Sequence, residues 1–159
     1  MNKPDRTPDY TIAINRLPNF QDIGGNRRHF NAWAEYRAFK LDKRRWVDQL
    51  TLDGYRSNGI GSVPYLAGAI GYTVTFFIAS EHELARHKRR DEDNAQAALK
   101  TLLDVLETPR IIGATNVRGW LGVYDNDNQL ERIDSIRYEH NPNVAALSMT
   151  TLRFWELDQ

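Results

Sequence analysis

The stretch that decides the fold is residues 91–106, DEDNAQAALKTLLDVL. Its apolar residues recur at intervals of three and four, which places them on one stripe of an α-helix. The stripe consists of Ala95, Ala98, Leu99, Leu102, Leu103 and Leu106. Asp93, followed three residues later by Gln96, has the form of a capping box, so we expect the helix to begin near Asp93. Such a helix needs a second apolar layer to cover its stripe.

Strands on either side of this helix supply the second layer. Residues 72–79, YTVTFFIA, are rich in β-branched and aromatic side chains and form the clearest strand pattern in the chain. Further strands are expected at residues 10–14, 129–139 and 145–157. A second helix is expected from an Asn31 cap to about Leu50, and the charged segment 81–90 is interpreted as a loop. Of the four tryptophans, we assign Trp33, Trp46 and Trp155 to the core and place Trp120 in a loop near the acidic motifs.

Composition limits the classes of function. The 159 residues are interpreted as one domain, 1–159, with residues 1–9 flexible. Because 21 basic and 21 acidic side chains cancel, a general DNA-coating protein is excluded, and nucleic-acid binding would need local basic runs such as 40–45 and 86–90. The absence of cysteine excludes disulfides and thiolate zinc sites and is typical of a cytoplasmic protein. The uncharged stretch 57–80 is interrupted by glycine and proline, so we expect no membrane span.

Acidic residues at the start of the helix are the first candidate for chemistry. Asp91 and Asp93 are two residues apart, so in extended backbone both carboxylates point to one side and can meet one ion. The basic run Lys88, Arg89 and Arg90 precedes them and would attract phosphate. Oxygen ligands of this kind suit Mg²⁺, or Mn²⁺ in its place. The alternative, that these residues cap the helix and are simply solvated, remains open.

Residues 125–128, DNDN, are a second acidic motif. A calcium-binding EF-hand loop is excluded, because Leu130 and Ile136 stand where glycine and a bidentate glutamate are needed. The alternative to a metal-binding role is a hairpin turn, which aspartate and asparagine favour. His82 and His87 flank the basic run, but no further histidine completes a transition-metal site, and we interpret both as solvated loop residues.

In this order the motifs resemble the RusA family of Holliday-junction resolvases. Residues 89–94, RRDEDN, are similar to the family's basic run followed by Asp-x-Asp-Asn. Residues 100–106, KTLLDVL, are similar to its Lys-x-x-x-Asp-Ala-Leu, and residues 127–130, DNQL, to its Asp-x-Gln-Val. The resemblance covers residues 72–157 well and the first 70 residues in outline. It implies an α+β fold in which a mixed β-sheet of about four to five strands packs against two main helices.

The resemblance also implies an activity, namely magnesium-dependent cleavage of branched DNA by a homodimer. Asp91, Asp93 and Asp127 would hold the metal, Lys100 would contact phosphate or the attacking water, and Lys88, Arg89, Arg90 and Asn94 would bind DNA. Two departures bear on this: Lys100 lies seven residues after Asp93 where the family has four, and Asn126 replaces an aspartate. A catalytically inactive junction-binding module and a hydrolase of small phosphate esters therefore remain alternatives.

Overall fold

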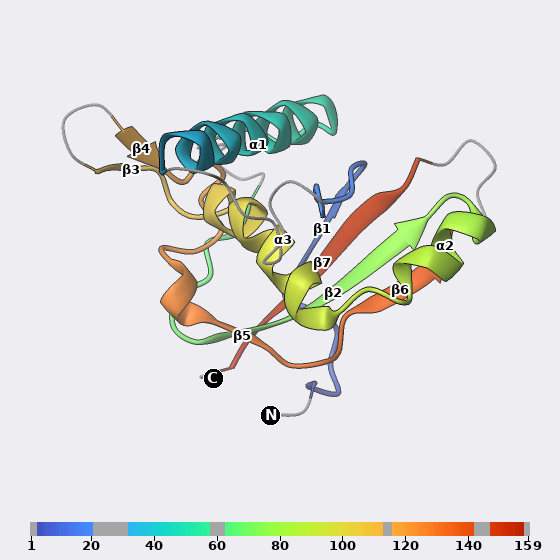
Figure 1. The fold of residues 1–159 in the computed structure, drawn as a ribbon. Helices are drawn as coiled ribbons and strands as arrows, with labels where there is room; N and C mark the ends of the chain where they lie inside the picture. Colours follow the sequence, from blue (N-terminus) through green and yellow to red (C-terminus); the bar gives the residue numbers. More distant parts are fainter. Residues whose placement is uncertain (1–2, 21–31, 58–62, 113–115, 142–146, 158–159) are drawn as a thin grey trace.

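A nine-residue strand, β2 (Ile70–Ile78), organises a five-stranded mixed sheet in the computed structural model of this chain (Figure 1). The structure describes residues 3–20, 32–57, 63–112, 116–141 and 147–157. The other elements of the sheet are β1 (Tyr10–Ile14), β5 (Leu130–Arg132), β6 (Arg137–His140) and β7 (Met149–Glu156). The described helices are α1 (Ala32–Leu52), α2 (Glu81–His87) and α3 (Glu92–Val105). The chain is therefore α+β, as expected.

Strand β2 is hydrogen-bonded to three other strands. It runs antiparallel to β7, which in turn pairs with β1, and parallel to both β5 and β6. The single strand expected over 129–139 is thus two short strands in succession along one edge of β2. Between them the Ile133 amide still donates to the Tyr72 carbonyl, at 3.0 Å. The strand expected over 145–157 is confirmed as β7 over residues 149–156.

The hydrophobic core lies between one face of the sheet and the helices. Alternate β2 residues such as Val74 and Phe76 are fully buried and pack in one cluster with Leu99 and Leu102 of α3 and with Trp46 of α1. Alternation is expected, because successive side chains of a strand point to opposite faces. The whole apolar stripe expected on α3 is buried. Figure 1 shows α1 lying across α3 on this side of the sheet.

Helix α3 begins two residues earlier than the capping-box pattern predicts. Asp91 is the N-cap, and its Oδ1 accepts from the Asp93 amide at 3.1 Å. Gln96 does not cap the helix. Its amide instead donates to the Tyr72 hydroxyl and accepts from Arg132, each at 2.8 Å. The expectation failed because a tertiary contact to β2 and the β5 strand competes for the Gln96 side chain.

The segment 81–90, expected as a loop, contains the short helix α2. Ser80 caps it by accepting from the Glu83 amide, and Glu81 and Glu83 sit in its first turn, where the helix dipole favours acidic side chains. His87 at its end is buried rather than solvated. Its ring lies 5.5 Å from the Phe20 ring and 6.3 Å from the Tyr138 ring, measured between centroids.

Two other expectations are corrected by the structure. Trp46 and Trp155 are buried as predicted, but Trp33 is 63% exposed on α1, because its helical position points away from the core. The segment before Trp120, expected as a loop, contains a pair of antiparallel strands, β3 (Arg110–Ile112) and β4 (Asn116–Arg118). The proposed Asn31 cap lies outside the described residues. No helix in the described part of the chain is long and apolar enough to cross a membrane.

The burial of His87 predicts a pH-dependent loss of stability. Desolvation, followed by the charge of Arg90, holds the pKa of His87 below its usual value of 6.5. The unfolded chain therefore takes up a proton as the pH falls below about 6.5 while the folded chain resists it. We expect the free energy of unfolding of the wild type, relative to that of His87→Gln, to fall between pH 7.5 and 5.5. The difference between the two profiles isolates His87 from the buried Glu107, whose raised pKa acts in the opposite direction over this range.

Urea denaturation at each pH measures this effect, with His82→Gln on the exposed side of α2 as the matched control. Identical profiles for the wild type and His87→Gln would show that His87 titrates equally in the folded and unfolded states.

Candidate functional site

Three carboxylates meet at the C-terminal end of α3. They belong to Asp104 on the helix, Glu107 just after it, and Asp127 at the start of the short 3₁₀ helix η1 (Asp127–Gln129). One oxygen atom of each lies within 4.8 Å of the others, a spacing that allows the group to hold a metal ion. It is the only such group of three or more acidic, histidine or cysteine side chains in the described part of the chain.

Arg118 of β4 lies against this group. Its Nε and Nη2 atoms donate to the two carboxylate oxygens of Glu107, at 3.0 and 3.2 Å, and Nη2 also donates to Asp104 at 3.3 Å. Glu107 is fully buried, and a buried charge requires a partner of this kind. Both oxygens of Glu107 are therefore engaged by protein, which leaves Asp104 and Asp127 as the carboxylates able to bind something else.

Protonation further separates Glu107 from the other two acids. Burial raises the pKa of Glu107 to about 7, while the hydrogen bonds from Arg118 act in the opposite direction. Near neutral pH, a proton thus competes with any incoming cation for Glu107. Its role is to hold Arg118, and through Arg118 it fixes Asp104.

An open pocket lies along α3 beside Asp104 and Asp127. Gln96, Lys100 and Asp104 line it from successive turns of the helix, since residues four apart share a helix face. Lys100 Nζ and Arg118 Nη2 each lie 3.9 Å from Asp127 Oδ2, beyond hydrogen-bonding distance. Asp127 is partly exposed and keeps its capacity to accept hydrogen bonds or coordinate a cation.

The turn that carries Asp127 is fixed by its neighbours. Asn126 caps η1 in a reciprocal capping box with Gln129. The Gln129 amide also donates to the carbonyls of Leu66 and Gly68, at 3.2 and 2.8 Å. The hairpin turn considered from the sequence is therefore absent here. Asp127 projects into the pocket from a short helix tied to the segment before β2.

The structure does not bring Asp91 and Asp93 to Asp127. Both lie at the N-terminal end of α3, whereas Asp127 lies beside its C-terminal half, next to Lys100 and Asp104. The 14 residues of α3 span about 21 Å at a rise of about 1.5 Å per residue. One ion cannot bridge the two ends. Asp91 caps the helix and Asp93 is exposed. Their role as metal ligands stays a prediction.

The predicted DNA-binding residues are dispersed around the end of α2. Lys88 and Arg89 are exposed, and Asn94 is half-buried on α3. Arg90 is partly buried, with its guanidinium carbon 4.1 Å from the centre of the Phe20 ring, a cation–π contact. Lys88 and Arg89 are therefore the members of this run that solvent or a ligand can reach most freely.

The sequence gives little indication that Asp104, Glu107 and Asp127 form a group. Asp104 was recognised only as part of the Lys-x-x-x-Asp motif, although its spacing of four from Lys100 places both on one helix face. Glu107 and Arg118 carried no local signal, because they are joined only when the β3–β4 hairpin folds back on α3. Their pairing is a long-range contact.

Comparison of the chain with models of known protein families and with curated protein sequences gives no match. The resemblance to RusA nucleases therefore rests on the motifs alone.

Gly119, next to Arg118 in the chain, provides a test of this arrangement. Its φ is +82°, and a Cβ there would lie 2.4 Å from the Thr108 carbonyl oxygen and 2.6 Å from that of Glu107. Gly54 has a similar φ of +97° but nothing within 4 Å. We expect the free energy of unfolding of Gly54→Ala to fall by about 1–2 kcal/mol, because alanine is strained in left-handed backbone. In Gly119→Ala it should fall by at least about 2 kcal/mol more, because the added Cβ would displace the surrounding backbone.

Urea denaturation of the two variants measures the difference. Equal losses would mean that the backbone around Gly119 can relax and does not hold Arg118 in place.

Proposed function

We propose that this chain is a magnesium-dependent endonuclease of the RusA type, acting on branched DNA, with its metal held by Asp104 and Asp127. The observation that carries the proposal is the meeting of Lys100, Asp104 and Asp127 in one open pocket. Two carboxylates beside a lysine suit a phosphodiester as substrate, because magnesium commonly binds through one or two carboxylates plus substrate phosphate. The order of motifs along the chain and the α+β class agree with this family.

Each protein group has a distinct part in the proposed reaction. Asp104 and Asp127 would hold a magnesium ion, and the chemistry this ion would supply is activation of water and neutralisation of phosphate charge. Lys100 is 64% exposed in its side chain and can reach a phosphate oxygen beside Asp127. Arg118 donates to one oxygen of Asp104 and so restrains this carboxylate, which lines the pocket. Resolution of a four-way junction needs two related cuts, so the proposal includes a two-fold homodimer.

Cleavage of a synthetic four-way junction, with Mg²⁺ and then with EDTA, tests the activity. Asp104→Asn and Asp127→Asn are expected to lower the cleavage rate at least about 100-fold, because each removes charge from the metal site. Asp91→Asn and Asp93→Asn, at the far end of α3, serve as matched controls and should cleave at close to the wild-type rate. Thermal melting of all four variants checks that each is folded.

The opposite pattern, with loss in Asp91→Asn and Asp93→Asn alone, would move the site to the start of α3 and overturn the pocket assignment. Absence of metal-dependent cleavage by the wild-type protein on any branched substrate would overturn the activity itself.

A second candidate function is junction binding without catalysis. It is favoured by Arg118, whose guanidinium already neutralises part of the acidic group, and by the distance of Asp91 and Asp93 from Asp127. In this case the exposed cations near α2 would hold DNA backbone while the carboxylates stabilise the hairpin. Tight junction binding with no cutting at any metal concentration would select this candidate.

Both candidates predict that Lys88 and Arg89 contact phosphate. Each contact releases counterions, so affinity falls as salt rises. The magnitude of the slope of log affinity against log salt should decrease by about 1 in each of Lys88→Gln and Arg89→Gln. The measurement is junction binding by fluorescence anisotropy across a salt series. Arg56→Gln, an exposed arginine after α1, is the control, and a slope unchanged from wild type in all three variants would place the DNA elsewhere.

A further inference from the structure

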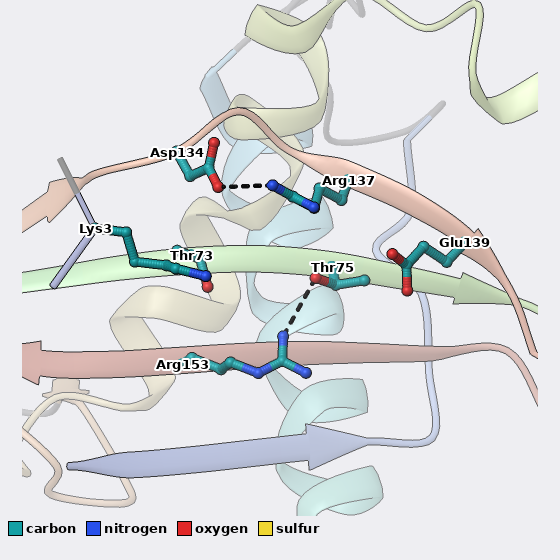
Figure 2. Close-up of a pocket in the computed structure, with 7 residues that line it drawn as sticks. All are labelled: Lys3, Thr73, Thr75, Asp134, Arg137, Glu139 and Arg153. Atoms are coloured by element: carbon teal, nitrogen blue, oxygen red, sulfur yellow. Dashed lines mark hydrogen bonds and ion pairs between the residues drawn. The ribbon is translucent and has the colours of Figure 1, made fainter. Parts of the chain in front are cut away.

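The sheet has a second face, turned away from the helices, with a polar hollow in its middle. Figure 2 shows this hollow from the open side, with α1 and α3 behind the sheet. It has a volume of about 150 Å³. Seven residues line it: Lys3, Thr73, Thr75, Asp134, Arg137, Glu139 and Arg153. Neither the acidic pocket nor the proposed reaction uses any of them.

Strand register brings the polar groups of the hollow together. Thr73 of β2 is paired directly with Arg153 of β7, and Thr75 with Arg137 of β6. Paired residues point to the same face of a sheet with their Cβ atoms about 5 Å apart. Lys3, from the segment before β1, lines the same hollow (Figure 2). Three cations from separate segments therefore line one hollow together with two threonines.

Two of these cations form no salt bridge among the described residues, although the charge of Lys3 helps to lower the pKa of Asp134. Arg137 is paired with Asp134 at 3.2 Å, and Asp134 also accepts from the Ser135 amide. By contrast, Lys3 and Arg153 enter none of the ion pairs found among the described residues. Arg153 Nη1 donates to the Thr75 hydroxyl at 3.3 Å, which leaves its other donors for a ligand. Three cations against the two carboxylates of Asp134 and Glu139 give the hollow a net charge of +1.

Two nearly buried threonines, Thr73 and Thr75, contribute polar groups to the hollow besides its charged side chains. Thr73 and Thr75 are 7% and 5% exposed, so their hydroxyls form a nearly buried floor. A hydroxyl can donate to an anion while accepting from Arg153. The planar fork of a guanidinium matches the oxygens of a phosphate, and a lysine adds a compact charge. A tetrahedral anion with several acceptor oxygens can use donors that arrive from three directions.

We propose that this hollow binds a phosphate group, held by Lys3 and Arg153 above the hydroxyls of Thr73 and Thr75. Glu139 also lines the hollow and opposes the anion, so it weakens binding. The site lies on the face of the sheet opposite the Asp104–Asp127 pocket and does not depend on metal or cleavage. Two sources share the chemistry of this ligand: a free phosphate ester and the backbone of a nucleic acid.

Titration with inorganic phosphate tests the site. NMR of the backbone amides, at low salt and in the presence of EDTA, detects the binding. We expect saturable shifts at residues 73–75 and 153. Arg153→Gln and Lys3→Gln should each weaken phosphate binding about 10-fold or more, as expected for losing one charge-assisted hydrogen bond. Arg44→Gln, which removes an exposed arginine from α1 behind the sheet, is the control and should bind as the wild type does.

A second pair of variants tests the opposing charge. Glu139→Gln should bind phosphate several-fold more tightly, whereas Glu131→Gln, an exposed glutamate of β5 outside the hollow, should leave affinity unchanged. Because Lys3 precedes the first strand, Lys3→Gln keeps the test open even if Arg153→Gln fails to fold. The proposal is overturned if the wild type shows no saturable shifts at these residues, or if Lys3→Gln and folded Arg153→Gln bind as tightly as the Arg44→Gln control.

Junction binding across a salt series separates the two sources. A salt slope lowered by about 1 in Lys3→Gln would identify the phosphate as nucleic-acid backbone. An unchanged slope, together with lost binding of inorganic phosphate, would identify a free phosphate ester. The phosphate titration contains no magnesium and measures no cleavage. A negative result in it is therefore distinguishable from failure of the proposed nuclease activity.

Discussion

The packing of α3 against β2 is the constraint that positions the acidic pocket. Leu99 and Leu102 are fully buried against the sheet, and each such side chain contributes roughly 1.5–3 kcal/mol through burial. With this stripe fixed, the rotation of the helix is fixed too. Lys100 and Asp104 must then project from its flank, where the 3₁₀ helix η1 brings Asp127 to meet them. The chemistry of the pocket therefore depends on an apolar contact that takes no part in it.

Elements with strong periodicity were predictable from the sequence. Strand β1, strand β2, helix α1 and helix α3 lie where alternation or helical spacing placed them, because each buries one continuous face. Short elements were missed for a physical reason. Helix α2 has seven residues and is stabilised mainly by its cap and its contacts, and the strands β5 and β6 exist only because β2 offers an unpaired edge. Trp33 was misplaced because residue type alone does not tell which side of a helix is covered.

The candidate site was predictable only in part. Asp127 and Lys100 were identified from motifs and do lie together, yet Asp91 and Asp93 stand at the other end of α3. Local patterns favoured the pair because two nearby carboxylates at a helix start resemble a ligand set and a cap equally well. Glu107 and Arg118 could not be found, since their partnership spans the β3–β4 hairpin and leaves no periodic trace. Distance along a helix axis, more than residue type, decided which acids could share an ion.

The side chain of Gln129 has a consequence for how sequences related to this one can vary. Its carbonyl oxygen accepts from the amides of Asp125 and Asn126, while its amide nitrogen donates to Leu66 and Gly68. Glutamate would keep the first role and lose the second, and lysine or arginine would do the reverse. Selection on this turn should therefore retain a side-chain amide at position 129 even where neighbouring polar residues vary. Covariation should link the segment 66–68 to the turn, although some 60 residues separate them in the chain.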